Sequence, residues 1–170
     1  MAYLMKTIVS DQLLTTLANE LVAHKIVLAT AESCTGGWIA KCITDVAGSS
    51  QWFDCGIVSY SNQSKIRLLG VSADTLDKHG AVSQAVVEEM ALGLLERSEA
   101  TFSIAVSGIA GPEGGSKDKP VGTVWIAWAN SNNKVITQCF VFSGSRDQVR
   151  TRAVNEALSG VQRVVTSNSQ

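Results

Sequence analysis

Helix-like and strand-like patterns alternate along nearly the whole chain, and this alternation restricts the fold more than any other feature of the sequence. Leucines recur on one helical face over residues 11–24, which predicts an amphipathic helix, and the apolar run at 26–30 predicts a strand. Further strands are expected at 55–61, 100–108, 121–130 and 134–142, and further helices at 35–48, 64–70, 84–97 and 146–165. Helices before, between and after strands predict a three-layer α/β/α sandwich in a single domain over residues 1–170. The central sheet is expected to be mixed, mostly parallel, and built of about five strands.

Polar or glycine-rich turns follow several of the predicted strands. They cover residues 32–37, 60–65, 108–115 and 143–146. The last two strands are joined by Asn-Ser-Asn-Asn, a connection of hairpin length, so at least one strand runs antiparallel to its neighbours. Open α/β sheets bind ligands at the carboxyl ends of their strands, where the backbone can approach a substrate closely. The chemistry is therefore expected in these turns.

The charge and cysteine content argue against several classes of site. Fourteen basic residues against fifteen acidic ones leave a net charge of -1, which gives no reason to expect binding to nucleic acid or to an anionic membrane. The four cysteines form no C-x-x-C pair and the two histidines form no H-x-x-x-H pair, so no metal site is expected. The first residues lack a signal-peptide pattern, and no apolar run is long enough to span a bilayer. We therefore expect a reduced, cytoplasmic, metal-free protein.

Ser33 and Cys34 are two potential nucleophiles side by side in the segment TAESCTGGWIAK. Ser33 follows a predicted strand and opens a predicted helix, a place where a nucleophile can lie beside backbone N–H groups that hold an oxyanion. Alternatively, Ser33 or Thr35 only caps the helix. Gly36 and Gly37 each lower helix propensity by about 1 kcal/mol, and close approach of a ligand would explain them. The sequence places no histidine beside Cys34, which makes the thiol the weaker candidate.

Lys65 is the base that the chain offers to a serine nucleophile. It lies in YSNQSK, where a predicted strand gives way to a helix. Burial disfavours the charged form of a lysine, so the pKa of a buried Lys65 would fall towards the range in which an amine acts as a general base. Tyr60 could bridge the hydroxyl of Ser33 and the amine of Lys65, or it could pack at the end of the strand. The alternative for Lys65 is a solvated helix lysine.

Arg146 and Arg150 lie four residues apart in the first turns of the last predicted helix, where the helix dipole disfavours positive charge. The segment SRDQ fits a capping box and supports a helix start at this point. A helix start beside the hydroxyls and glycine of residues 143–145 and a guanidinium is suited to bind a phosphate or carboxylate. The alternative is pairing of the arginines with Asp147 or Glu156. The sequence does not distinguish which arginine would hold a phosphate.

The segment SGIAGPEGGSKDKPVG, residues 107–122, holds five glycines and both prolines of the chain. A loop of this length in a compact domain is usually functional or mobile, so a role as a lid is possible. Its glycines match neither the P-loop nor the dinucleotide-binding fingerprint. No nucleoside triphosphate site is expected here by motif.

The chain resembles the CinA C-terminal domain family in six segments: AESCTGG, AGSSxWF, VSYSNxxK, HGAVS, SGIAGPxGGxxxKPVGTV and FSGxR. The resemblance runs from about residue 12 to 165, and the set is highly specific although each piece alone is weak. The family includes stand-alone nicotinamide-mononucleotide deamidases of the PncC type. The resemblance implies the three-layer fold, a homodimer, and a serine/lysine amidohydrolase without metal or organic cofactor. The motif serine, tyrosine, lysine and phosphate-side arginine of the family fall on Ser33, Tyr60, Lys65 and Arg146.

The resemblance and the residues together lead to one expected mechanism. Ser33 attacks the carboxamide of nicotinamide mononucleotide, Lys65 takes the serine proton directly or through Tyr60, and water cleaves the acyl-enzyme to nicotinate mononucleotide. Substrate binding is expected from Thr35, Gly36, Gly37, Ser107, Gly108, Ala110, Gly111, Arg146 and Arg150. Two alternatives stay open, namely a regulatory module that binds a nucleotide or another phosphorylated metabolite, and an amidase for a different carboxamide.

Overall fold

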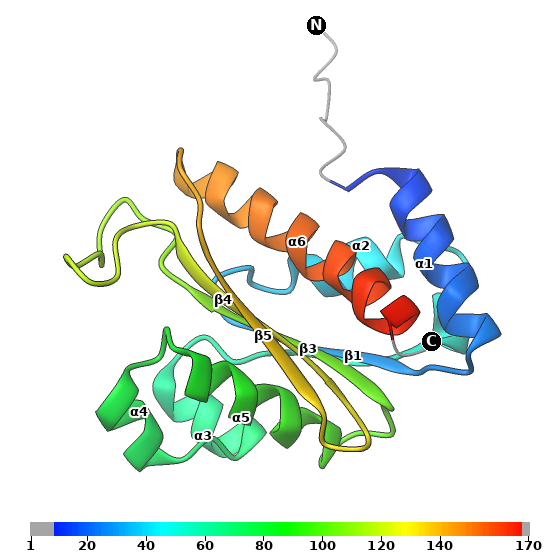
Figure 1. Ribbon diagram of the computed structural model, residues 1–170, viewed down its shortest axis with the longest axis horizontal. Helices are drawn as coiled ribbons and strands as arrows, with labels where there is room; N and C mark the ends of the chain where they lie inside the picture. Colours follow the sequence, from blue (N-terminus) through cyan, green and yellow to red (C-terminus); the bar gives the residue numbers. More distant parts are fainter. Residues whose placement is uncertain (1–8, 168–170) are drawn as a thin grey trace, which may run out of the picture.

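A five-stranded sheet lies between two layers of helices in the computed structural model, which describes residues 9–167 (Figure 1). The strands are β1 (Leu28–Glu32), β2 (Phe53–Val58), β3 (Phe102–Gly108), β4 (Thr123–Asn130) and β5 (Val135–Val141). The helices are α1 (Asp11–Ala23), α2 (Trp38–Thr44), α3 (Asn62–Leu69), α4 (Ala73–His79), α5 (Gln84–Leu95) and α6 (Arg146–Ser167), with a short 3-10 helix, η1, at Ser49–Gln51. The predicted three-layer α/β/α architecture is confirmed.

The sheet is mixed, with the strand order β2-β1-β3-β4-β5. β1 pairs in parallel with both β2 and β3, whereas β4 runs antiparallel to β3 and to β5. β5 therefore points the same way as β1, β2 and β3, and the prediction of a mostly parallel sheet is confirmed for strand direction. The hairpin between β4 and β5 supplies the reversed strand, as its asparagine-rich connection predicts.

Two apolar cores join the helices to the two faces of the sheet. α1, α2 and α6 lie above the sheet in Figure 1, and their buried residues include Leu17, Ile43 and Val161. α3, α4 and α5 lie below it, where Met90 and Leu94 of α5 pack with alanines of β1, β3 and β4. Because both faces are covered, the central strands read as nearly continuous apolar runs in the sequence.

The position of α6 on the sheet is set by a glycine that faces a tryptophan. A Cβ atom added at Gly160 would collide with the indole of Trp128, so only glycine allows the helix to lie this close. The Nε1 of Trp128 donates to the carbonyl of Ala157 at 2.9 Å. This contact fixes the long helix whose first turns reach the carboxyl end of the sheet.

Helix α2 is shorter than the helix predicted over 35–48. Gly36 and Gly37 have φ angles of +61° and +91°, in the left-handed region that glycine adopts readily. The two glycines therefore form a turn before the helix, which begins at Trp38.

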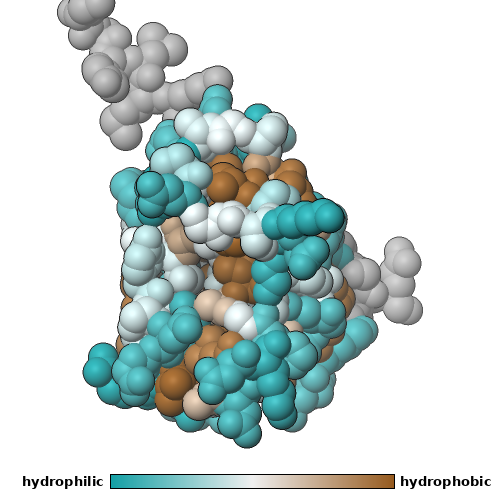
Figure 2. Space-filling view, turned by 90° about the vertical axis from the view of Figure 1, so that its left-hand side faces the viewer, coloured by the Kyte–Doolittle hydropathy of each residue, from teal (hydrophilic) through white to brown (hydrophobic). Residues whose placement is uncertain are grey.

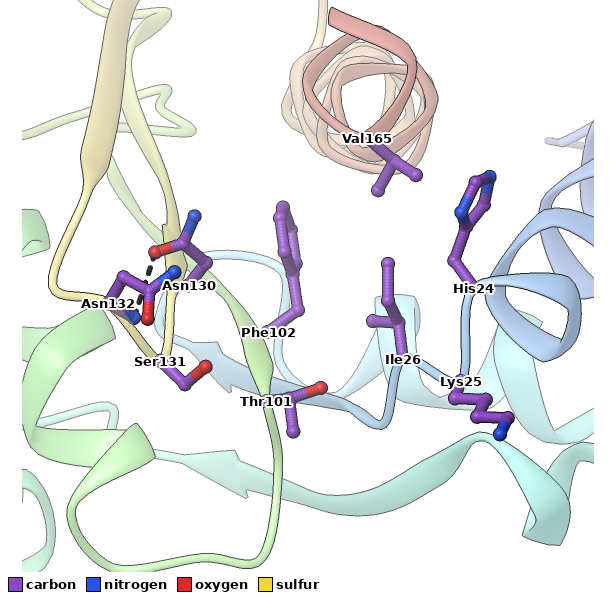
Figure 3. Close-up of a pocket in the computed structure, with 9 residues that line it drawn as sticks. All are labelled: His24, Lys25, Ile26, Thr101, Phe102, Asn130, Ser131, Asn132 and Val165. Atoms are coloured by element: carbon purple, nitrogen blue, oxygen red, sulfur yellow. Dashed lines mark hydrogen bonds between the residues drawn. The ribbon is translucent and has the colours of Figure 1, made fainter. Parts of the chain in front are cut away.

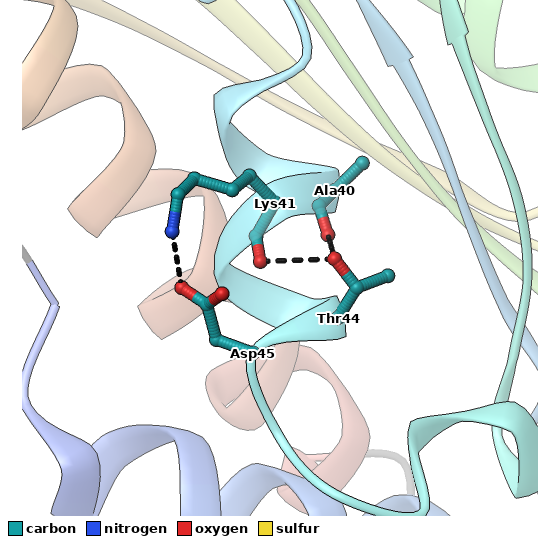
Figure 4. Close-up of polar contacts among 4 residues, drawn as sticks. All are labelled: Ala40, Lys41, Thr44 and Asp45. Atoms are coloured by element: carbon teal, nitrogen blue, oxygen red, sulfur yellow. Dashed lines mark hydrogen bonds and ion pairs between the residues drawn. The ribbon is translucent and has the colours of Figure 1, made fainter.

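The last turn of α2 is held by its own side chains (Figure 4). The hydroxyl of Thr44 donates to the carbonyl of Ala40 at 2.9 Å and to that of Lys41 at 3.1 Å. Lys41 also pairs with Asp45, four residues further on, and both side chains are exposed. Exposed pairs of this kind contribute little to stability, so α2 is positioned mainly by its buried face and by the turn that precedes it.

The prediction from sequence missed α4 and placed β1 too early. α4 is seven residues long and buries only Leu76, so it carries no periodic pattern. β1 begins at Leu28 and not at 26, because the amide of Ile26 still donates to the carbonyl of Leu21 and Lys25 adopts a φ of +54°. Residues 24–27 therefore form the turn between α1 and β1.

The carboxyl ends of β1, β2, β3 and β5 share one edge of the sheet, on the left in Figure 1. β1 leads into α2 above the sheet, and its neighbour β2 leads into α3 below it. Where the connections of adjacent strands leave to opposite faces, a crevice opens at the strand ends. The turns that the sequence singled out for chemistry meet at this crevice.

Candidate functional site

Ser33 and Lys65 meet between the carboxyl ends of β1 and β2. Ser33 is the first residue after β1, and Lys65 lies in α3, the helix that follows β2. The Nζ of Lys65 is 3.1 Å from the Oγ of Ser33, and the two residues are only 1% and 8% exposed. The side chains predicted as base and nucleophile are thus in hydrogen-bond contact.

The two side chains lie on the wall of a pocket of about 210 Å³. Figure 2 views this end of the molecule and shows apolar residues along its middle with hydrophilic residues around them. The pocket is lined by Ser33, Cys34, Tyr60, Asn62, Lys65, Ala81, Val82, Ser107, Gly108, Ala110 and Arg146. All three predicted catalytic residues belong to this lining. Asn62, Ala81 and Val82 were not predicted to belong to it, although the segment HGAVS, noted only for its family resemblance, contains the last two.

Lys65 is surrounded by hydrogen-bond acceptors, and no carboxylate in the described part of the chain pairs with it. Its Nζ donates to the carbonyl of Ser59 at 2.8 Å and to that of Tyr60 at 3.4 Å. Burial lowers the pKa of Lys65 below its ordinary value, and the neighbouring Cys34 opposes this shift. The Nζ also donates to the Oγ of Ser33, so its three acceptors are two backbone carbonyls and one hydroxyl.

Cys34 lies beside the serine but is not prepared for nucleophilic attack. It is 6% exposed, and burial raises the pKa of its thiol to about 11. Arg150 and Lys65 lower this pKa by less than burial raises it. The thiol therefore stays protonated near neutral pH, and since the thiolate is the reactive form, Cys34 serves as a wall of the pocket.

The turn between β1 and α2 is capped by Glu32, a residue that the sequence analysis did not single out. The side chain is buried, with 1% of the residue exposed, and its carboxylate accepts from the amides of Gly37 at 3.1 Å, Ile39 at 3.1 Å and Ala40 at 2.9 Å. A carboxylate at a helix N-terminus satisfies amides that otherwise lack partners and interacts favourably with the helix dipole. The alternative in which the hydroxyl of Ser33 caps the helix is therefore wrong, and this hydroxyl is available to Lys65.

Two amides that donate to no other described residue lie one turn before α2, and that of Cys34 contacts its own thiol. The amide of Ser33 donates to the carbonyl of Val106 in β3, and the amide of Gly36 donates to the carbonyl of Ser33. Within residues 9–167, the amides of Cys34 and Thr35 donate to no other residue. The carboxylate of Glu32 already accepts from the amides at the start of α2. The amides of Cys34 and Thr35 are therefore the remaining candidates to hold an oxyanion. In α/β-hydrolases, the amide of the residue after the nucleophilic serine has this role.

Arg150 holds the same turn from α6. Its Nε donates to the carbonyl of Cys34 at 3.0 Å and its Nη2 to that of Thr35 at 3.2 Å, while the guanidinium lies 4.9 Å from the ring centroid of Trp38. The hydroxyl of Thr35 is buried and has no hydrogen-bond partner in the described structure. Predicted substrate-binding residues that do not line the pocket are Thr35, Gly36, Gly37, Gly111 and Arg150.

Arg146 reaches the rim of the pocket from the first turn of α6. Its Nη1 donates to the carbonyl of Gly111 at 2.8 Å, and its Nη2 donates to the phenol oxygen of Tyr60 at 3.1 Å. The phenol of Tyr60 is thus directed to the arginine, whereas Lys65 contacts only the backbone carbonyl of this tyrosine. The arginine joins the β2–α3 turn, the glycine-rich loop and α6 at one point.

The predicted capping box at the start of α6 is confirmed. The amide of Ser145 donates to the Oε1 of Gln148 at 2.8 Å, and the amide of Gln148 donates to the Oγ of Ser145 at 3.3 Å. The carbonyl and hydroxyl of Ser143 both accept from Arg152, at 2.6 and 3.1 Å. The anion-binding site expected at residues 143–145 therefore has fewer available groups than the sequence suggested, because Ser143 already binds Arg152.

The 107–122 loop is tied to the turn between α4 and α5. The Nζ of Lys119 donates to the carbonyl of His79 at 2.6 Å, and the hydroxyl of Ser107 donates to the carbonyl of Ala81 at 2.7 Å. The loop and this turn therefore form one continuous wall of the pocket. Movement of the loop as a lid stays a prediction.

A larger hollow, of about 360 Å³, lies at the opposite end of the sheet (Figure 3). Its walls come from the α1–β1 turn, the start of β3, the β4–β5 hairpin and α6, and they include His24, Lys25 and Thr101. Among the described residues, no hydrogen bond joins this histidine or this lysine to a hydroxyl in the hollow. Size alone therefore does not mark the reactive site.

The described residues contain neither a metal cluster nor a membrane helix. In residues 9–167, no three His, Cys, Asp or Glu side chains are grouped so that they could hold a metal ion. None of the helices in this range has the length and apolar character that crossing a bilayer requires.

Named relatives resemble the chain over most of its length. The nicotinamide-nucleotide amidohydrolase PncC of Escherichia coli K12 is 52% identical over 147 residues, which cover 86% of this chain and 89% of that protein. The protein of the same name from Pseudomonas putida is 49% identical over 157 residues, which cover 90% of this chain and 98% of the relative.

Solved structures share the fold. The competence/damage inducible protein CihA of Agrobacterium tumefaciens superposes with a TM-score of 0.89 at 39% identity, covering 96% of this chain and 98% of that one. The competence damage-inducible protein A of Klebsiella pneumoniae gives 0.86 at 41% identity, covering 89% and 94%. The sequence model of the CinA C-terminal domain matches residues 10–165. The resemblance seen in the motifs is thus confirmed, and the chain belongs to the CinA C-terminal domain family.

Proposed function

We propose that this protein is an amidohydrolase that converts nicotinamide mononucleotide into nicotinate mononucleotide and ammonia. Relatives at about half identity bear the name nicotinamide-nucleotide amidohydrolase. The observation that carries the proposal is the buried contact of 3.1 Å between the Nζ of Lys65 and the Oγ of Ser33. A base at this distance can activate a serine hydroxyl in a site without histidine.

The first half of the reaction forms an acyl-enzyme. Neutral Lys65 takes the hydroxyl proton while the Oγ of Ser33 bonds to the carboxamide carbon, and the carbonyl electron pair moves onto oxygen. The amide of Cys34, with that of Thr35 beside it, holds this oxyanion. The lysine, now charged, gives its proton to the amide nitrogen, the C–N bond breaks, and ammonia leaves an ester on Ser33.

The second half returns the enzyme to its starting state. Lys65 removes a proton from water as the water oxygen bonds to the ester carbon. The tetrahedral intermediate collapses, the Oγ of Ser33 leaves and recovers a proton from the lysine, and nicotinate mononucleotide departs. These steps require no metal and no organic cofactor.

The size of the pocket orients the substrate. At about 210 Å³ it is smaller than ligand pockets of roughly 300–1,000 Å³, so only part of a nucleotide enters it. The carboxamide must reach Ser33, and the phosphate then lies towards the rim, where Arg146 is exposed. A guanidinium suits a phosphate because it offers two parallel donors. Arg146 is favoured over Arg150 for this role, because Arg146 lines the pocket and Arg150 does not.

The test is to incubate the purified protein with nicotinamide mononucleotide and to measure ammonia and nicotinate mononucleotide. Equal amounts of both products are expected from the wild type and none from Ser33→Ala. Binding of the nucleotide without ammonia release would overturn the proposal in favour of a regulatory module. Ammonia from other carboxamides alone would overturn it in favour of an amidase of different specificity.

A further inference from the structure

Two charged side chains outside the pocket hold the turn that carries Ser33. Glu32 accepts from amides on one side of the turn, and Arg150 donates to carbonyls on the other. We propose that Glu32 and Arg150 are positioning residues that align the amides of Cys34 and Thr35 for the oxyanion. The inference rests on the proposed amide hydrolysis.

Glu32 is a buried carboxylate without a cationic partner among the described residues. A buried charge is costly unless hydrogen bonds compensate it, and here the amides of the Gly37 turn and of the first turn of α2 do so. The backbone carbonyl of Glu32 accepts from the amide of Ser59 at 2.8 Å, and the carbonyl of Ser59 accepts from Lys65 at 2.8 Å. One chain of hydrogen bonds therefore links the capped turn to the base.

Arg150 fixes the direction of the peptides on either side of Thr35. The carbonyl and the N–H of one trans peptide point in opposite directions. Because the guanidinium holds the carbonyl of Cys34, the amide of Thr35 points away from α6. A charged donor on this carbonyl also polarises the peptide and strengthens its N–H as a donor. The ring of Trp38 under the guanidinium limits its movement.

Within the turn, the amide of Gly36 donates to the carbonyl of Ser33 and that of Trp38 to the carbonyl of Thr35, and its two glycines make external support necessary. Gly36 and Gly37 adopt positive φ angles, and glycine is the residue with the most conformational freedom. The buried face of α2, with Ile39 and Ile43, holds the helix in the absence of either clamp. Loss of a clamp is therefore expected to misalign the amides while the fold remains.

The experiment compares Arg150→Ala and Arg150→Lys with the wild type and with Arg163→Ala, a matched arginine further along α6 in an exposed pair with Glu156. The substrates are nicotinamide mononucleotide and its dephosphorylated riboside. Arg150→Ala should lower kcat about ten- to hundredfold on both substrates, since small misplacements cost about that much, with KM nearly unchanged. The kcat of Arg150→Lys should lie between those of the wild type and Arg150→Ala, because a lysine cannot donate to both carbonyls in the same planar geometry. The pH midpoint of kcat should not move, because Lys65 is untouched.

A rise in KM confined to the phosphorylated substrate would overturn the inference, because Arg150 would then read the phosphate. A kcat equal to that of Arg163→Ala would overturn it as well. Glu32→Gln should also lower kcat, since an NH2 group replaces one acceptor oxygen. Should this buried substitution prevent folding, the two Arg150 variants carry the test.

Hydrogen exchange in the 33–37 segment separates this inference from the proposed function. If the wild type releases no ammonia, the proposed function fails, and the exchange measurement still decides on the clamp. Faster exchange of this segment in Arg150→Ala than in Arg163→Ala supports the clamp, and equal exchange overturns it.

Discussion

At the scale of single residues, burial shifts the pKa of both Lys65 and Cys34. Burial disfavours the charged form of each group, so it lowers the pKa of the lysine and raises that of the thiol to about 11. The same burial thus favours the neutral form of the amine and keeps its neighbour from becoming a thiolate. The proposed mechanism therefore uses Ser33 as the nucleophile, because its activation needs a base and no charge of its own.

Substitution at the two neighbouring nucleophiles separates their roles. Ser33→Ala should abolish ammonia release, whereas Cys34→Ala should retain most of it, because the thiol only lines the pocket. Steady-state kinetics on both variants, with circular dichroism to verify folding, check this. If both variants fold and Cys34→Ala is as inactive as Ser33→Ala, the assignment of Ser33 as the nucleophile is wrong.

The pH dependence of the reaction should follow Lys65. In the proposed mechanism the neutral amine is the active form, so kcat/KM should rise with pH through a pKa below that of an ordinary lysine and stay high above it. Lys65→Arg should be inactive over the whole range, since guanidinium does not lose its proton. A pH–rate profile of both proteins is the measurement, and an active Lys65→Arg enzyme would exclude the lysine as the base.

The contact between Ser33 and Lys65 could be predicted from sequence, because a hydroxyl and a lysine are side chains that stand out at strand ends. The role of Glu32 could not. Its carboxylate reaches amides five, seven and eight positions ahead. This reach depends on the left-handed path of the two intervening glycines, and capping patterns read from sequence assume a helix that starts within three residues.

At the scale of elements, α6 supplies two arginines with different roles. Arg146 lies at the rim of the pocket, and Arg150, one turn later, lies against the turn of Ser33. The sequence could mark both as unusual at a helix start, but it could not separate them. Only their contacts separate them, since Arg146 donates to Gly111 and Tyr60 whereas Arg150 donates to the turn of Ser33.

Arg146→Ala should weaken use of the phosphorylated substrate. A charge-assisted hydrogen bond is worth roughly 1.5–3 kcal/mol, so kcat/KM for nicotinamide mononucleotide should fall about ten- to a hundredfold. The turnover of the dephosphorylated riboside should hardly change. The thermal midpoint should change little, because the lost contacts to Gly111 and Tyr60 are offset by removal of a charge that opposes the helix dipole. Equal losses on both substrates would show that Arg146 does not read the phosphate.

At the scale of the whole molecule, the fold could be predicted because the apolar periodicity changes with each element. The layer to which each helix belongs could not be predicted, and this assignment creates the site. Ser33 precedes a helix above the sheet and Lys65 lies in a helix below it, so their contact joins the two layers. The homodimer expected from the family stays a prediction.

The buried lysine should also affect the stability of the whole molecule. Its pKa is lower in the folded state than in the unfolded state, so between the two values the unfolded chain binds more protons. The free energy of unfolding must then rise with pH through this window. Lys65→Met removes this contribution. The thermal midpoint of the wild type minus that of Lys65→Met should therefore gain in value as the pH increases. Lys78→Met, at an exposed lysine, is the control and should show no such gain. Parallel curves for all three proteins would contradict the assignment of a depressed pKa.

The place of α6 after every strand of the sheet also affects how the protein matures on the ribosome. Ser33 and Lys65 are synthesised early, but both arginines that serve them are made only after β5 has been completed. A nascent chain that still lacks α6 has a sheet with one face partly uncovered and a nucleophile turn without its guanidinium support. Domains generally fold as units during synthesis. Hydrolytic competence should therefore arise in a single late event, when the final helix docks, and chains released before that event gain no partial activity.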